Sequence, residues 1–123
     1  NDNENLLRQD LYSYARLFNL VVHYELGNYD LIEYLVKSTL RYLNKKNRDF
    51  LLEKTLISYI RKLSKNLSDE KRLHLFKECR NEVEVLFDEE DNRFMLNYFD
   101  FICWLDSKIY NVEFAEVVKN VNV

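Results

Sequence analysis

The chain has 123 residues, of which 47% are hydrophobic and 32% are charged, and its formal net charge at pH 7 is −3. This hydrophobic content excludes disorder by composition, and the absence of a long apolar run excludes a membrane span. At this length about two thirds of the extended surface can be buried, so the core needs no disulfide or metal.

The first predicted helix runs from about Asn5 to Leu26 and carries apolar residues every three or four positions. Its stripe consists of Leu7, Leu11, Tyr14, Phe18 and Val21, widened by Ala15, Val22 and Leu26. Gly27 follows as the only glycine in a chain without proline. Because glycine tolerates the left-handed conformation that ends helices, Gly27 predicts the structural turn of a helical hairpin.

The second predicted helix begins at a capping-box-like pair, Asp30 and Glu33, and ends near Leu43. Its apolar face consists of Leu31, Leu35, Ser38 and Tyr42. After a polar break at 44–48, a third helix is expected over about 49–63. The third stripe consists of Leu52, Leu56, Tyr59 and Leu63, with Phe50, Ile57 and Ile60 alongside.

Three further helices complete the pattern. The fourth, over about 69–87, follows Ser68 as a plausible N-cap. Its apolar face consists of Leu73, Phe76, Val83 and Phe87, rimmed by Leu75, Cys79 and Leu86. The fifth, over about 89–110, begins in the acidic run 88–91 and is apolar on two sides. Its two faces are Phe94, Tyr98, Phe101 and Leu105, and Met95, Phe99, Ile102 and Ile109, joined by Trp104. A short last helix is expected over about 112–119 after an Asn111 cap.

Short connections make consecutive helices antiparallel neighbours, and no β alternation competes with the helical pattern. The sequence therefore predicts an all-α fold of five long helices and one short helix in a single domain over residues 1–123. The helical hairpins are stacked as a superhelix segment or, alternatively, folded into a compact bundle.

The segment from Gly27 to Ser38, Gly-Asn-Tyr-Asp-Leu-Ile-Glu-Tyr-Leu-Val-Lys-Ser, resembles the middle of a tetratricopeptide repeat. The stretches Lys-Ser-Thr-Leu-Arg-Tyr-Leu and Tyr-Phe-Asp-Phe-Ile-Cys-Trp-Leu-Asp-Ser-Lys are also similar to the C-terminal helical region of large uncharacterised bacterial repeat proteins. The resemblance implies a bacterial interaction scaffold and the C-terminal part of a longer helical-repeat protein. It implies no catalytic residue.

Charge is distributed unevenly, because residues 37–72 hold 11 basic and 4 acidic side chains. Within this block Lys37, Arg41 and Lys45 recur every four residues, which places them on one line of a helix, with Tyr34 and Tyr42 nearby. We call Lys37, Arg41 and Lys45 the cationic ridge. It could bind an acidic peptide, a terminal carboxylate or a phosphate backbone, or it could be a solvated face.

A second candidate surface is aromatic. Phe99, Trp104 and Tyr110 exceed what one core needs, so we expect an association face for self-association or for docking another protein. The leading hypothesis is a non-catalytic protein–protein interaction scaffold, with a homo-oligomer as one option. The alternative is a nucleic-acid-associated or regulatory helical domain that uses the basic block, against which the sequence pI of about 5.4 argues.

Catalytic and metal sites are not expected. His23 and His74 have no further ligands at metal spacing, and one glycine cannot build a phosphate-binding loop. Cys79 and Cys103 fit no metal-ligand pattern, so we expect free thiols in a reducing cytoplasm. The opening residues carry neither a basic nor an apolar region, so no signal peptide is expected. The sequence thus predicts no enzyme, no cofactor and no membrane association.

Overall fold

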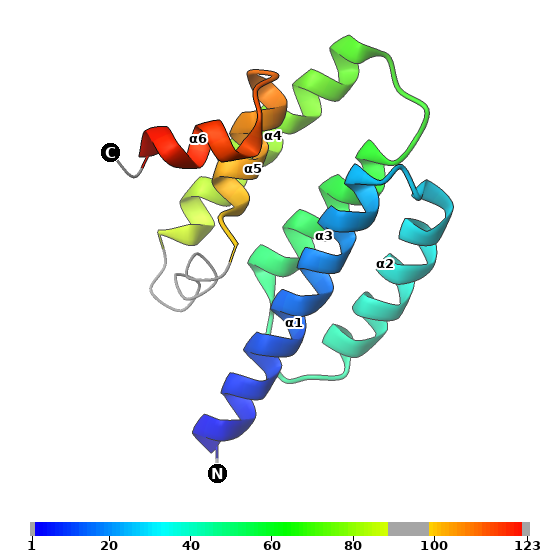
Figure 1. Cartoon of the computed structure of the whole chain (residues 1–123). Helices are drawn as coiled ribbons and strands as arrows, with labels where there is room; N and C mark the ends of the chain where they lie inside the picture. The colour runs from blue at the N-terminus through cyan, green and yellow to red at the C-terminus, as the bar shows by residue number, and fades with distance from the viewer. Residues whose placement is uncertain (1, 89–98, 122–123) are drawn as a thin grey trace. The chain divides into compact units, whose positions relative to one another are not determined.

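The computed structural model describes residues 2–88 and 99–121, and these residues form helices joined by turns and irregular segments, with no strand among them (Figure 1). The predicted all-α class is confirmed. Contacts divide the chain into two compact units, Asn1–Lys65 and Asn66–Val123. We call them unit 1 and unit 2.

Unit 1 contains α1 (Asp2–Glu25), α2 (Tyr29–Asn44) and α3 (Leu51–Leu63). Consecutive helices run antiparallel, and each of the three contacts the other two (Figure 1). Short connections leave consecutive helices no other way to cover their apolar sides. The predicted helical hairpin between the first two helices is therefore present.

Gly27 forms the turn of this hairpin as predicted, with a φ of 75°. Its N–H donates to the Tyr24 carbonyl at 3.0 Å, and the Asn28 N–H donates to the His23 carbonyl at 2.9 Å. This pair of hydrogen bonds is a Schellman motif, which satisfies carbonyls at the end of α1. The position requires the backbone freedom of glycine and not its small size, since a Cβ there would meet no atom within 4 Å.

The predicted capping box at the start of α2 is wrong. The N-cap is Asn28, whose side chain makes no capping hydrogen bond. Glu33 points elsewhere and accepts hydrogen bonds from Arg61 of α3. A cation across the helix pair binds this carboxylate more strongly than a neutral backbone N–H would.

The core of unit 1 confirms the predicted face of α3 but not those of α1 and α2. All seven residues predicted for the third stripe are buried. In α1 the buried line is Ser13, Leu17, Leu20, Val21 and Tyr24, whereas Leu7, Leu11 and Phe18 are exposed. In α2 the buried line is Ile32, Val36, Thr39 and Leu43, one position along from the predicted Leu31, Leu35, Ser38 and Tyr42. Both helices have two apolar stripes, and the neighbouring helices select which one is buried.

The chain enters α3 through an unusual backbone conformation at Phe50, which has a φ of 49°. Phe50 is buried, and the Arg48 guanidinium lies 4.5 Å from the centre of its ring. A bulky residue in the left-handed region is strained by about 1–2 kcal/mol. Burial of the Phe50 ring in the core offsets this cost.

Unit 2 contains α4 (Asp69–Phe87), α5 (Phe101–Ile109) and α6 (Phe114–Val121), and α5 contacts both of the others. Ser68 is the N-cap of α4 as predicted, since its hydroxyl accepts a hydrogen bond from the Lys71 N–H at 3.2 Å. The buried line of α4 is Phe76, Cys79, Val83 and Phe87, which confirms most of its predicted face. Leu73, predicted on that face, is 38% exposed.

The fifth predicted helix is not continuous over 89–110, because it is interrupted at residues 99 and 100. Residues 89–98 lie outside the described residues, and with them the predictions for Phe94, Met95 and Tyr98. Phe99 and Asp100 are not helical, and α5 begins at Phe101. Asp100 is the N-cap, because its carboxylate accepts the Cys103 N–H at 2.9 Å and competes with helix continuation.

Asn111 was predicted to cap the last helix, and this is wrong. Its φ is 54°, and the following Val112 N–H donates to the Ser107 carbonyl at 3.0 Å. Asn111 therefore ends α5 in the same way that Gly27 ends α1, since asparagine tolerates this conformation better than most residues with a side chain. The last helix begins later, at Phe114.

Candidate interaction surface

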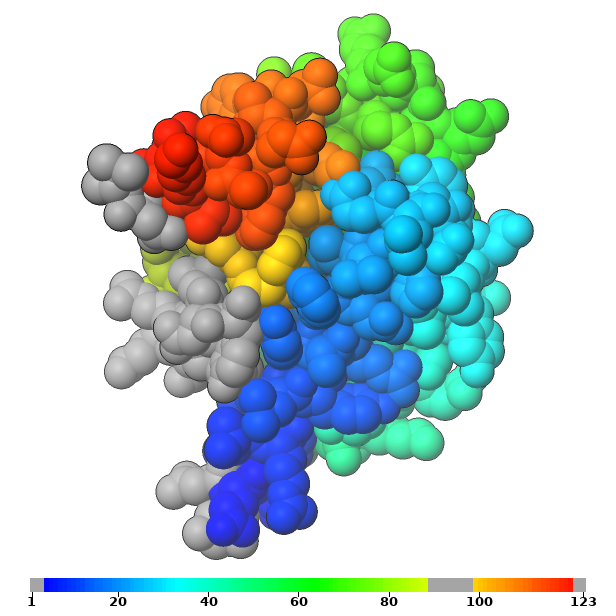
Figure 2. Space-filling view, in the orientation of Figure 1, coloured from blue at the N-terminus to red at the C-terminus, as the bar shows by residue number. Residues whose placement is uncertain are grey.

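The cationic ridge lies on the side of α2 opposite its buried line. Lys37, Arg41 and Lys45 are all exposed, and Tyr34 one turn earlier is 68% exposed. Side chains of α2, coloured light blue to cyan, lie at the molecular surface in Figure 2. Among the described residues, neither Arg41 nor Lys45 has an ion-pair partner. The ridge therefore presents two uncompensated charges and an aromatic ring to solvent.

The first residue of the ridge belongs to a larger charged cluster around Glu33. Arg61 of α3 donates from Nε at 3.1 Å and from Nη2 at 2.6 Å to the two oxygens of Glu33. Lys65 lies 3.4 Å away and Lys37 4.0 Å away from the same carboxylate. The hydrogen bond from Arg61 is the main cause of a lowered Glu33 pKa. One carboxylate thus faces three cations, and the cluster carries a net positive charge.

Tyr42 is not part of the exposed ridge, contrary to its predicted place beside it. Its half-buried ring packs against Tyr12 of α1 with centroids 4.1 Å apart. Lys46 Nζ lies 4.9 Å from the centre of the Tyr42 ring. Burial raises the pKa of its hydroxyl. Tyr42 therefore stabilises the contact between α1 and α2.

The predicted aromatic face does not form one exposed surface. Trp104 is 3% exposed and packs edge-on against Phe76 with centroids 5.9 Å apart. Phe99 is half-buried and stacks on Phe114 at 5.1 Å. Only Tyr110 is open to solvent, at 71% exposure. The expectation of an exposed face is wrong for Trp104. In unit 2, α5 packs against α4 and α6, and the aromatic side chains of α5 are part of the core.

A buried carboxyl group between α1 and α3 was missed by the sequence analysis. Glu53 is 4% exposed, and its Oε2 accepts a long hydrogen bond of 3.5 Å from the Ser13 hydroxyl. Burial is the main cause of a raised Glu53 pKa. Beside it, Arg48 and Asp10 form an ion pair at 2.8 Å. The sequence signal that could have indicated a buried Glu53 is its position next to Leu52, on the apolar side of a helix whose other side is basic.

The described residues bring together no metal-binding cluster. No group of three or more His, Cys, Asp or Glu side chains there could hold a metal ion. Burial raises the pKa of Cys79 and of Cys103 to about 12, so neither is a thiolate at neutral pH. His74 pairs with Glu78 at 2.7 Å on the exposed side of α4. Among the described helices, none has the length and apolarity needed to span a bilayer.

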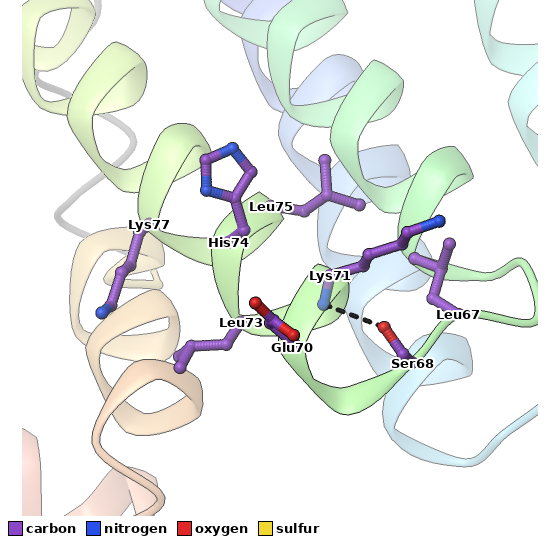
Figure 3. Close-up of a pocket in the computed structure, with 8 residues that line it drawn as sticks. All are labelled: Leu67, Ser68, Glu70, Lys71, Leu73, His74, Leu75 and Lys77. Atoms are coloured by element: carbon purple, nitrogen blue, oxygen red, sulfur yellow. Dashed lines mark hydrogen bonds between the residues drawn. The ribbon is translucent and has the colours of Figure 1, made fainter.

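A hollow of about 620 Å³ lies along the first turns of α4 (Figure 3). Figure 3 shows Leu73 and Lys77 on the opposite side of the helix from Leu67 and Leu75, so the lining residues do not converge on one point. The hydrogen bond drawn there is the Ser68 cap of the helix. The hollow therefore offers no convergent polar groups for a ligand.

Comparisons with protein families, with curated proteins and with solved structures find no match for this chain. The resemblance to tetratricopeptide repeats therefore stays a prediction that rests on the residues around Gly27.

Proposed function

We propose that this chain is a non-catalytic protein-interaction module and that the cationic ridge of α2 binds an acidic segment of another protein. The observation that carries the proposal is the line of exposed cations, of which Arg41 and Lys45 have no ion-pair partner among the described residues. A partner that brings carboxylates to this line gains charge-assisted hydrogen bonds without breaking existing ones there. The exposed Tyr34 ring supplies an apolar contact beside these charges.

The remaining basic block supports a protein partner over a nucleic acid. Arg48 is paired with Asp10, and Arg61 is paired with Glu33. Lys46 and Lys62 lie over tyrosine rings. A nucleic-acid surface needs many cations directed at one phosphate backbone. Here several cations of the block are directed at groups within unit 1.

The tetratricopeptide-like arrangement, the bacterial source and the cytoplasmic location are part of the same proposal. The helical hairpin that Gly27 closes, with exposed polar residues on its outer helix, supports the tetratricopeptide-like arrangement alone. Repeat proteins of this kind use helix surfaces to bind peptides.

The test measures binding of a fluorescein-labelled hexaglutamate peptide by fluorescence polarisation at low ionic strength. Arg41→Glu is expected to weaken binding by about tenfold or more, because it replaces attraction with repulsion. The matched control is Arg8→Glu, which makes the same charge change at an exposed arginine of α1 in the same unit. Equal affinities for the two variants would show that the ridge is not the binding surface.

Salt and a second probe complete the experiment. Binding through exposed charges should weaken steeply as salt shortens the Debye length to about 8 Å at physiological ionic strength. A labelled single-stranded oligonucleotide serves as the comparison. If it binds more tightly than hexaglutamate and is equally sensitive to Arg41→Glu, the nucleic-acid alternative replaces the proposal.

A further inference from the structure

The cluster around Glu33 suggests how the ridge recognises its partner. Arg61 presents Nε and Nη2 to the two Glu33 oxygens at 3.1 and 2.6 Å. This fork is the geometry in which arginine binds a carboxylate of another molecule. Lys65, in the turn that follows α3, adds a hydrogen bond at 3.4 Å. The free protein therefore already contains an anion-binding point, filled by its own side chain.

The cluster is open and has an excess of cations. The side chains of Lys37, Arg61 and Lys65 are 65%, 45% and 57% exposed, and that of Glu33 is 30% exposed. Pairs at this exposure are worth little individually, so exchange of one carboxylate for another is energetically easy. Lys37 belongs to both the cluster and the ridge, which makes the two surfaces continuous.

We propose that Glu33 acts as an internal competitor: it holds the place on Arg61, Lys65 and Lys37 that a carboxylate of the acidic partner takes on binding. The inference rests on the proposed function of the ridge. It assigns the site a ligand class, a carboxylate-bearing segment long enough to reach from Arg61 to Arg41. It also assigns Glu33 the effect of lowering affinity.

The test asks whether removing the competitor strengthens binding. Glu33→Gln keeps the side-chain shape and removes the charge, and it should raise the affinity for labelled hexaglutamate by roughly three- to tenfold. Asp30→Asn is the matched control, because it makes the same charge change at an exposed position of α2 that has no partner among the described residues. It should raise affinity by less than about twofold, through net charge alone.

Arg61 distinguishes competition from a general charge effect. In the double variant Glu33→Gln with Arg61→Gln, the gain should disappear, because the freed fork is the group that binds the peptide. Circular dichroism checks that each variant is folded, and Glu33→Ala repeats the measurement without the amide group.

The outcomes separate the two proposals. If Arg41→Glu weakens binding but Glu33→Gln does not exceed Asp30→Asn, the ridge stands and the competitor inference is overturned. A gain that persists without Arg61 also overturns it. If Arg41→Glu behaves like Arg8→Glu, the proposed function itself fails, whatever Glu33→Gln does.

Discussion

Leu11 and Leu17 lie on the same helix and have the same side chain, but Leu11 is 39% exposed and Leu17 is fully buried. The three- and four-residue spacing of apolar side chains in the sequence places Leu11 on the predicted core stripe. The structure instead buries Leu17. Replacing each leucine by alanine therefore tests the correction directly. The two variants are matched in chemistry, in helix and in backbone conformation.

The magnitudes differ because only Leu17 leaves a cavity. Leu17→Ala should lower the free energy of unfolding by about 2–5 kcal/mol, as large-to-small changes in packed cores do. Full burial of a leucine is worth about 1.5–3 kcal/mol, and about three fifths of Leu11 is buried, so Leu11→Ala should cost about 1 kcal/mol. The better helix propensity of alanine offsets a few tenths of that.

The assay is urea unfolding followed by far-ultraviolet circular dichroism, with both variants and the parent chain measured at the same pH. We expect the midpoint of Leu17→Ala to fall well below that of Leu11→Ala, with similar slopes. Equal losses, or a larger loss for Leu11→Ala, would refute the assignment of the buried face of α1.

Three further predictions concern backbone, titration and reactivity. Gly27→Ala should lower the free energy of unfolding by about 1 kcal/mol because of the left-handed backbone alone, whereas Asn111→Gly should raise it by a few tenths of a kcal/mol. Thermal unfolding midpoints measure both changes. An unchanged midpoint for Gly27→Ala would contradict the turn. The pKa of Glu53 is raised in the folded state, so the folded chain keeps the Glu53 proton to higher pH than the unfolded chain does. The free energy of unfolding should therefore fall as pH rises above 4.5, the ordinary pKa of a glutamate. Glu53→Gln should flatten this dependence when unfolding is measured against pH. Cys79 and Cys103 should resist a thiol reagent at pH 8 in the folded protein and react after denaturation, and rapid labelling of the native chain would show that they are not buried.

Several local features were predictable because their causes are local. The Ser68 cap depends on one hydroxyl and the N–H three residues later. The turn at Gly27 depends on the one residue in the chain without a Cβ. The helix α3 has a single apolar side opposite a basic one, so its buried face was unambiguous. In each case the deciding interactions lie within one turn of helix or one amphipathic face.

The candidate surface was predictable in part for the same reason. Cations spaced four apart on a helix share a face, and a charged face turns to solvent, so Lys37, Arg41 and Lys45 are where the spacing places them. The contact of Glu33 with Arg61, 28 positions later, was not predictable, because it requires α2 and α3 to lie side by side. The burial of Trp104 required its packing partner Phe76 from another helix.

The sequence by itself determined the helical class, the hairpin turn and the basic character of the outer face of α2. Only the tertiary structure decided between competing apolar stripes, since α1 and α2 each carry two and the choice depends on which side the neighbouring helices cover. It also decided the partners of charged groups, since Glu33 binds Arg61 of α3 rather than capping α2, and Glu53 is buried beside Ser13. Periodicity specifies a face within one helix, but the energies that select among faces arise between helices.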